Sequence, residues 1–289
     1  MHKLTLCAYF CNLQAKTTSI LRGIQKRLRI IFVIYTMKIK IEDFFKPVQV
    51  KDDFSKDDYE IVEAFINFAK SLSRLTYQSI YLIDYSKKSF LFVSDNPIFL
   101  CGSTPTEVMR EGYYHYVNNV PENDLHLLKK INDVGFDFFG NLDAEDRLKF
   151  SISYDFHLKQ PGNKPLLVNH KLKPLLLDKF SNPWIALCLV SISSHANSGN
   201  IRYKSDEDGK QFEYDLAKDI WVETPRIKLK PREKDILLFS AQGLTMDQIA
   251  DQLYVSIDTV KFHKKQIFSK LKVKSITEAT ALAIELSLF

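Results

Sequence analysis

The stretch SIDTVKFHKKQIFSKLKVK, residues 256–274, predicts an amphipathic helix with a basic outer surface. Ser256 suits the N-cap position, because its hydroxyl can accept from the free backbone N–H groups of the first turn. Val260, Ile267 and Leu271 recur at helical spacing and predict one buried stripe. The stretch has one acid, Asp258, and lysines at positions 261, 264, 265, 270, 272 and 274. Such a helix suits the major groove of DNA, which admits an α-helix; a solvated basic helix is the alternative.

The sequence before this stretch predicts another helix. Pro231 suits the first helical position, where its missing N–H costs nothing, and Gly243 suits a helix end. The helix is expected to run from 232 to 242. Its expected buried residues are Ile236, Leu237 and Ala241.

A short second helix and a tight turn follow. Thr245 can cap this helix, and Tyr254–Val255 form the turn into Ser256. Its expected inward-facing residues are Ile249, Ala250 and Leu253. Helix, short helix, tight turn and basic helix is the helix-turn-helix pattern. Residues 277–289 predict one more helix, with Ala279, Leu282, Ala283 and Leu286 as its apolar stripe.

Residues 229–279 resemble the LuxR-type (GerE-like) DNA-binding domain of bacterial transcription regulators. The resemblance runs without gaps through REKDIL, AQGLT, IADQL, VSIDTVKFH, KL-V and TEA, within about the last 60 residues. Three positions depart from the family pattern. Lys230 replaces the usual Thr or Ser cap of the first helix, Met246 stands where Asn is common, and Ile276 stands where a basic residue is common. The first departure should weaken one helix start slightly, and the last should remove one backbone contact.

The resemblance implies how this domain meets DNA. It implies that Lys261, Phe262 and Lys265 enter the major groove, with His263 packed beside them, while hydroxyls and further lysines hold phosphates. The implied DNA-binding residues are Thr245, Ser256, Thr259, Lys261, Phe262, Lys264, Lys265, Lys270 and Lys274. The alternative for Phe262 is that it packs against the first helix and reads no base.

The resemblance also implies that the last helix pairs two subunits. The predicted dimerisation residues are those of its apolar stripe: Ala279, Leu282, Ala283 and Leu286. The alternative is that this stripe only completes the core of its own domain.

Length and charge distribution indicate two globular domains. The chain has 289 residues, is 45% hydrophobic and 12% aromatic, and carries a net charge of +5. Residues 1–37 hold six basic residues and no acid, residues 38–223 hold 23 against 28, and residues 224–289 hold 11 against 7. The basic C-terminal part is therefore the part expected to meet nucleic acid.

The middle of the chain predicts an antiparallel sheet with helices. A helix is expected near 57–72, burying Ile61, Phe65, Phe68 and Leu72. Two strands are expected within 78–94, joined by the turn Ser86–Lys88, and three more at 148–158, 166–177 and 184–194. Helices are expected at 106–118 and 122–139, and short strands with a hairpin tip at 206–209 within 200–222.

This order of elements, with two strands, helices and three longer strands, is that of a PAS domain. The phrases YLIDYSKKSFLFVSDN, FLCG, YDFHLK and NPWIALCLVSIS resemble the PAS-like sensor half of LuxR-type regulators common in Bacteroidetes. The expected fold is α+β, a PAS-like antiparallel-sheet sensor domain followed by an all-α four-helix LuxR-type domain. The expected division is a helical segment 37–75, sensor domain 76–222, linker 223–228 and DNA-binding domain 229–289.

Other chemistry has little support in the sequence. Asp84 ends a strand as a receiver-domain phosphoacceptor would, but a polar hairpin follows it instead of a helix. Histidines 115, 126, 157, 170 and 195 lack metal-site spacing, and the four cysteines are too sparse for a disulfide framework or a zinc site. The sequence also lacks GxSxG, a phosphate-binding glycine loop and paired carboxylates on one helix. We therefore expect no enzyme, no metal and no tightly held cofactor; a hydrolase within 38–223 is the weaker alternative.

Residues 1–36 differ from the rest of the chain. Their apolar run, residues 30–35, is far too short to span a bilayer, which takes about 20 residues. We expect an unstructured or wrongly assigned extension rather than an anchor, and a protein starting at Met37 that folds and binds DNA as well. The expected partners of the chain are double-stranded DNA, a second copy of itself and a small-molecule or protein signal, with RNA polymerase as a further candidate. A cytoplasmic regulator is the leading hypothesis, and a protein-interaction module whose basic helices bind an acidic partner is the alternative.

Overall fold

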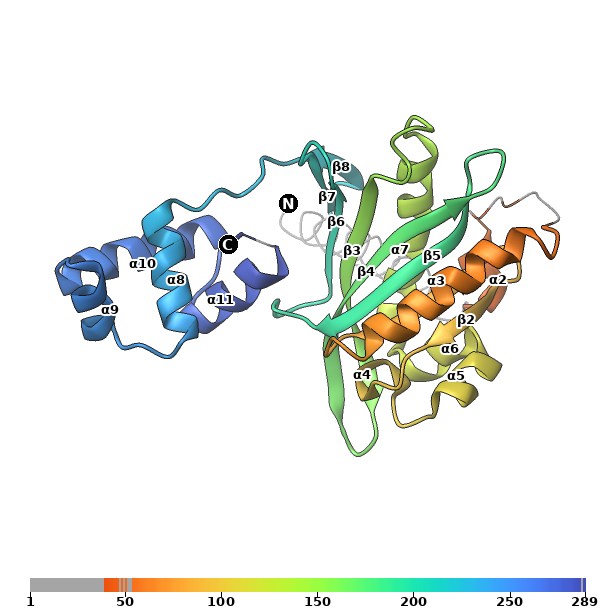
Figure 1. Ribbon diagram of the computed structural model, residues 1–289, viewed down its shortest axis with the longest axis horizontal. Coiled ribbons are helices and arrows are strands. Elements are labelled where there is room, and N and C mark those ends of the chain that lie inside the picture. Colours follow the sequence, from red (N-terminus) through yellow and green to blue (C-terminus); the bar gives the residue numbers. More distant parts are fainter. Residues whose placement is uncertain (1–38, 47, 49, 51–53, 287) are drawn as a thin grey trace, which may run out of the picture. The chain divides into compact units, whose positions relative to one another are not determined.

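The computed structural model describes residues 39–46, 48, 50, 54–286 and 288–289. The expectations for residues 1–36 lie outside the described residues. Within these, eight strands form one antiparallel sheet in the order β2-β1-β5-β4-β3-β6-β7-β8 (Figure 1). The strands are β1 (Ser79–Asp84), β2 (Ser89–Val93), β3 (Phe150–Gln160), β4 (Asn163–Leu177), β5 (Pro183–Ile192), β6 (Gly199–Ser205), β7 (Gln211–Asp215) and β8 (Ile220–Glu223). The expected α+β fold class is confirmed.

The side chains of β1 alternate between the two faces of the sheet and pack against helices on both. Ile80 and Leu82 point to one face, where they pack with Ala69 of α3 (Asp58–Ser73). Tyr81 points to the opposite face and stacks on Phe99 of α4 (Pro97–Leu100) at a centroid distance of 4.3 Å. Successive side chains of a strand point to opposite faces of the sheet. Because helices cover both faces here, β1 is buried on both sides.

The remaining helices of the sheet domain cover the Tyr81 face, which is opposite α3. They are α2 (Ile41–Phe45), α5 (Pro105–Glu111), α6 (Tyr114–Asn119) and α7 (Glu122–Gly140). The single helix expected at 106–118 is wrong in this respect, since the chain divides it into α5 and α6 at Gly112, whose φ is +57°. A capping box between Thr104 and Glu107 starts α5.

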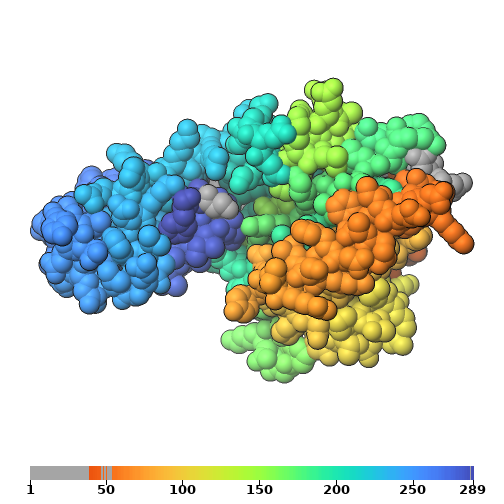
Figure 2. Space-filling view, in the orientation of Figure 1, coloured from red at the N-terminus to blue at the C-terminus, as the bar shows by residue number. Residues whose placement is uncertain are grey.

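The buried face of α3 also differs from the expectation. Ile61 and Phe68 were expected inside, yet they are 52% and 57% exposed. Val62 and Ala69 are buried instead, and Ile66 packs beside them. Phe65 and Leu72, also expected inside, are half-buried and pack against the same cluster. The face that meets the sheet is therefore centred between the predicted line and the line of Val62, Ile66 and Ala69. The outer side of α3, orange in Figure 2, lies at the surface.

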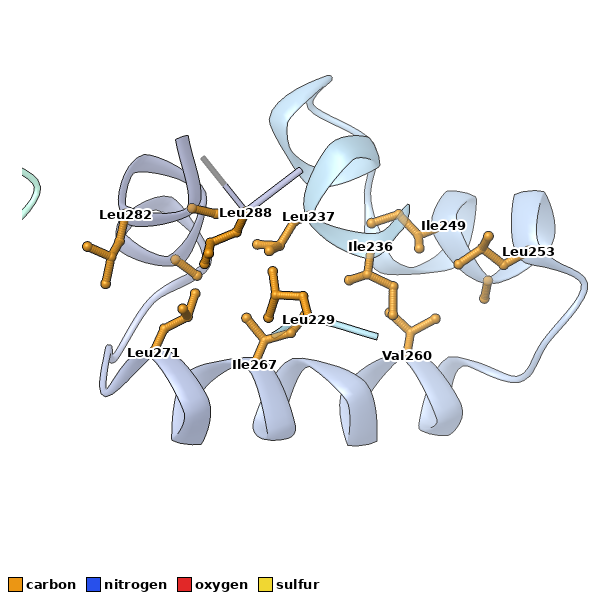
Figure 3. Packing of buried hydrophobic residues seen from close by; sticks show 13 residues of the cluster. Leu229, Ile236, Leu237, Ile249, Leu253, Val260, Ile267, Leu271, Leu282 and Leu288 are labelled. Carbon is orange, nitrogen blue, oxygen red and sulfur yellow. The ribbon is translucent and has the colours of Figure 1, made fainter. Parts of the chain in front are cut away.

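The C-terminal helices enclose a core of their own. They are α8 (Pro231–Ala241), α9 (Met246–Leu253), α10 (Ile257–Leu271) and α11 (Ile276–Glu285). Figure 3 shows Ile236 and Leu237 of α8 facing Val260 and Ile267 of α10, and these four side chains are at most 1% exposed. Burial of a large aliphatic side chain contributes about 1.5–3 kcal/mol. Ala241, expected in this core, is exposed, because it lies in the last turn of α8 beyond the stripe.

Candidate nucleic-acid interface

The N-terminus of α10 is organised as predicted. The Ser256 hydroxyl accepts from the backbone N–H of Thr259 at 3.2 Å, and the two hydroxyl oxygens lie 2.9 Å apart. Because Ser256 accepts from this N–H, one of the free donors of the first turn is satisfied. The helix start therefore presents two neighbouring hydroxyls beside the positive end of the helix dipole, which favours an anion such as a phosphate.

The buried stripe of α10 decides which side chains face outward. Val260 and Ile267 are fully buried in the domain core. Lys261 and Lys265 lie on the outer surface, four residues apart, and Phe262 is 57% exposed. The Phe262 ring therefore lies at the surface and is not packed into the first helix. It contacts the His263 ring edge-on, with 5.6 Å between the ring centroids.

One acid partly neutralises this face. The Lys261 ammonium lies 3.0 Å from the Asp258 carboxylate, and both side chains are more than half exposed. Exposed pairs of this kind contribute at most about 1 kcal/mol. Lys261 can therefore exchange Asp258 for a stronger acceptor at little cost.

The start of α9 carries the third hydroxyl of the predicted set. Thr245 accepts from the backbone N–H of Gln248 at 3.3 Å, and the Gln248 side chain accepts from the Thr245 N–H at 2.9 Å. This reciprocal pair is a capping box. Since the Thr245 hydroxyl acts as an acceptor in the cap, its own hydrogen is left to donate outward.

Lys270 is placed differently from the other predicted DNA-binding lysines. Its ammonium lies 2.6 Å from a carboxylate oxygen of Glu233 and 3.3 Å from the Lys228 carbonyl. Glu233 is buried and also accepts from the Lys230 N–H at 2.7 Å. Lys270 thus neutralises a buried charge at the start of α8, and the expectation of a phosphate contact from this residue needs correction. Of the others, Lys274 is exposed and Lys264 is half-buried.

The Glu233–Lys270 pair compensates for the missing cap at Lys230. Burial by itself raises the pKa of Glu233, but hydrogen bonds from Lys270 and the Lys230 N–H lower it overall. A carboxyl whose pKa is depressed by folding stabilises the protein above its unfolded pKa, about 4.3. That contribution is lost as the pH falls through the lower folded value.

Replacing Glu233 by Gln is expected to destabilise the C-terminal domain by about 1–3 kcal/mol at pH 7, because Lys270 loses its counter-charge. Hydrogen exchange in α8 and α10 of the full chain measures this. The difference from the wild type should shrink as the pH falls through the depressed pKa of Glu233, where the wild-type carboxyl takes up a proton. Asp258→Asn, at an exposed carboxylate on α10, is the control. An unchanged exchange rate in Glu233→Gln at pH 7 would contradict the structural role.

The predicted dimerisation stripe lies inside its own domain. Ala279, Leu282 and Ala283 are at most 4% exposed and belong to the core shared with α8 and α10, and Leu286 packs against it. These side chains are therefore not available to a second copy. The expectation of a dimer through them is corrected to the alternative, completion of the core. The outward apolar residue of α11 is Ile284, which is 63% exposed.

The acid and histidines considered for other chemistry have structural partners. Asp84 is buried, accepts from the Tyr59 hydroxyl at 2.6 Å and caps the following turn through the N–H groups of Ser86 and Lys87. His115 lies 2.7 Å from the Phe99 carbonyl oxygen. His157 and His195 lie beside Asp124 and Asp155, respectively.

The described part of the chain has neither a cluster of metal-ligating side chains nor a helix suited to a membrane. Among those residues, histidine, cysteine and acidic side chains form no group of three or more that could hold a metal ion. The helices in that part are also too short or too polar to cross a membrane.

Sequence reasoning missed the pairing of Glu233 with Lys270 and the outward position of Ile284. The only signal for the pair was an acid three residues after the cap of α8, which is the position from which a side chain reaches back to the cap N–H. Glu233 and Lys270 are 37 residues apart along the chain. The pairing therefore could not be predicted from neighbouring residues in the sequence.

Comparison with known proteins identifies the C-terminal domain. Residues 228–283 match the model of bacterial regulatory proteins of the luxR family. The nitrate/nitrite response regulator NarL of Escherichia coli K12 is 48% identical over 52 residues, which are 18% of this chain and 24% of NarL. LiaR of Bacillus subtilis strain 168, a transcriptional regulatory protein, is 41% identical over 59 residues, 20% of this chain and 28% of LiaR. The chain thus matches about a quarter of the length of these relatives, and this segment is a LuxR-type helix-turn-helix domain.

Solved structures add only a distant likeness. A structure of the Vibrio cholerae VqmA dimer in the absence of target DNA can be aligned with this chain. The alignment covers 79% of this chain and 88% of the VqmA chain. Its sequence identity is 14% and its TM-score is 0.26.

Proposed function

We propose that this chain is a sequence-specific transcription regulator that binds double-stranded DNA through α10. The observation that carries the proposal is the outer face of α10 within the luxR-family segment, where Lys261, Phe262 and Lys265 are exposed together. Lysine ammonium groups donate to guanine O6 and N7, and an aromatic ring can lie against a thymine methyl. The hydroxyls of Thr245, Ser256 and Thr259, with Lys264 and Lys274, are proposed to hold phosphates.

The sheet domain is proposed to be the sensor. Its elements follow the order of a PAS domain, and its strands β2-β1-β5-β4-β3 lie side by side with α4 to α7 on one face. A ligand or partner bound there would change DNA affinity or dimerisation. The proposed regulator acts as a dimer, with Ile284 on the outer side of α11 as the contact between copies.

Selection from random DNA tests this proposal. The full chain should enrich one motif, and its affinity for that motif should fall steeply with salt, because each neutralised phosphate releases counterions. Binding to all sequences alike would favour a non-specific role. If the chain selects no DNA but binds acidic polypeptides, the interaction-module alternative holds instead.

Phe262→Ala is expected to change the selected motif without destabilising the domain. Its ring is 57% exposed, so its removal leaves no cavity in the core. We expect the melting temperature to stay within about 2–4 °C, since exposed substitutions usually cost under about 0.5 kcal/mol. Thermal unfolding and DNA selection, run on the same protein, check both parts. A marked drop in melting temperature with an unchanged motif would show that Phe262 acts in folding.

A further inference from the structure

The sheet domain contains a cavity on the face opposite α3. Strand register brings three of its lining residues together: Leu172 lies opposite Ile152, and Ile152 lies opposite Tyr203. One part of the cavity, about 40 Å³, lies against α7, and a second part of about 40 Å³ adjoins it towards α6. Tyr85, Asn132, Tyr154 and Leu172 line both parts.

A glycine keeps the α7 side of this cavity open. Gly135 lies within α7, where glycine costs about 0.5–1 kcal/mol relative to alanine. A Cβ there would lie 3.1 Å from Ile152 Cδ1 and 3.8 Å from the Tyr203 hydroxyl oxygen, and all three residues line the cavity. The open space at Gly135 thus follows from a residue that lowers the stability of its own helix.

Polar groups without partners face this space. Among the described residues, the hydroxyls of Tyr85, Tyr113 and Tyr154 have no hydrogen-bond partner, although all three line the cavity. Tyr85 is 5% exposed. Because these hydroxyls face open space, they can donate hydrogen bonds to a molecule that enters the cavity.

A hydrogen-bond chain adds a further donor. His170 Nε2 lies 2.5 Å from the Tyr81 hydroxyl, which also bonds the Tyr116 hydroxyl. Nδ1 of His170 is buried without a partner among the described side chains and backbone groups. Burial lowers the pKa of His170 to about 3, so the ring is neutral.

The tautomer of His170 determines which group donates in each of the hydrogen bonds that join His170, Tyr81 and Tyr116. An unpaired buried N–H is rarer in proteins than an under-satisfied acceptor, so the hydrogen belongs on Nε2 and is donated to Tyr81. Tyr81 in turn donates to Tyr116, whose own hydrogen is left to point into the cavity.

The cavity excludes charge. Within the described part of the chain, no Asp, Glu, Lys or Arg lines either part, and the remaining lining includes Ile131, Phe136, Phe139 and Leu128. Burial also raises the pKa values of Tyr85, Tyr113, Tyr116 and Tyr154 far above the ordinary value, so these groups stay neutral. An ion brought into such a site would lose its hydration without a counter-charge.

We infer that this cavity binds a small uncharged molecule, one that presents hydrogen-bond acceptors to the tyrosine hydroxyls from an otherwise apolar body. The inference deepens the proposed sensing role of the sheet domain, because it names the chemical class of the signal.

Three small probes that share a phenyl ring test the class of ligand. Benzamide is neutral with an acceptor, benzoate is charged, and toluene is apolar. Titration of the full chain, followed by calorimetry, should give benzamide a Kd of about 0.1–1 mM, as expected for so few atoms. Benzoate and toluene should bind at least about tenfold more weakly, because one loses hydration and the other leaves the hydroxyls unpaired.

Variants locate the binding in this cavity. Tyr154→Phe and Gly135→Ala should each weaken benzamide about five- to tenfold, the first by removing a donor and the second by filling space. Gly140→Ala, where an added Cβ meets nothing within 4 Å, and Tyr114→Phe, at an exposed ring, are the matched controls and should bind as the wild type does.

Several outcomes overturn the inference. Equal binding of benzoate would show that charge is not excluded, and equal binding of toluene would show a dry apolar cavity. Binding of none of the three would leave water as the only occupant, and binding unaffected by Tyr154→Phe and Gly135→Ala would place the probe elsewhere. The titrations contain no DNA, so they can fail while the same protein still selects a DNA motif, and the reverse.

Discussion

Lys265→Ala is expected to weaken binding of the preferred DNA site by about 1–3 kcal/mol, roughly 5- to 150-fold, and to relax the choice at one base pair. Lys261→Ala should act similarly at a neighbouring base pair. The reason is positional: both ammonium groups lie on the outer face of α10, opposite the buried Val260 and Ile267. A lysine that donates to a guanine edge contributes to one base pair, whereas a phosphate lysine contributes to every sequence alike.

Two comparisons make this measurement decisive. Lys274→Ala, at a proposed phosphate contact, should weaken all sequences equally and reduce the salt slope by about 1. Lys270→Ala should alter the stability of the domain more than the motif, because its ammonium pairs with buried Glu233. DNA selection and affinity titration at several salt concentrations report on each variant. If both Lys261→Ala and Lys265→Ala leave the selected motif unchanged, a different face of α10 meets the DNA.

Leu282→Glu is expected to unfold the C-terminal domain. The Leu282 side chain is 4% exposed within the core, so the change both removes apolar packing and buries a carboxylate without a partner. Each of these effects costs several kcal/mol, and together they exceed about 4–5 kcal/mol. Hydrogen exchange in α8 and α10 should lose its protection, and DNA binding should disappear with it.

Ile284→Glu is the matched variant two residues further along α11. Ile284 is 63% exposed, so the carboxylate stays in water and the domain should keep its hydrogen-exchange protection. If two copies pair through the outer side of α11, this variant should lower the sedimentation mass of the protein on DNA and weaken binding. Unchanged mass and affinity would remove Ile284 from the proposed interface. Native protection in Leu282→Glu would show that the stripe does not complete the core.

The elements of the C-terminal domain could be predicted from residues close in sequence. Ser256 and Thr245 accept at helix starts as expected, because a cap depends only on residues within three positions. The spacing of Val260, Ile267 and Leu271 likewise predicted the buried stripe, since helical periodicity needs no knowledge of the partner.

The sheet domain was predictable to a smaller extent. Its strands and the hairpin tip between β6 and β7 were expected near their observed bounds. The face of α3 was not, because Ile61 and Phe68 lie on an apolar line nearly as good as that of Val62 and Ala69. When two lines compete, the shape of the sheet beneath the helix decides between them.

The sequence by itself determined the fold class, the helix-turn-helix segment and the outward lysines of α10, since these follow from local propensity and periodicity. Tertiary structure alone decided that Lys270 neutralises Glu233, that the stripe of α11 faces its own core, and that Tyr85, Tyr154 and His170 surround one cavity. Each of these depends on contacts between residues dozens of positions apart. Pairing of distant elements sets such contacts, and no short window of sequence carries that information.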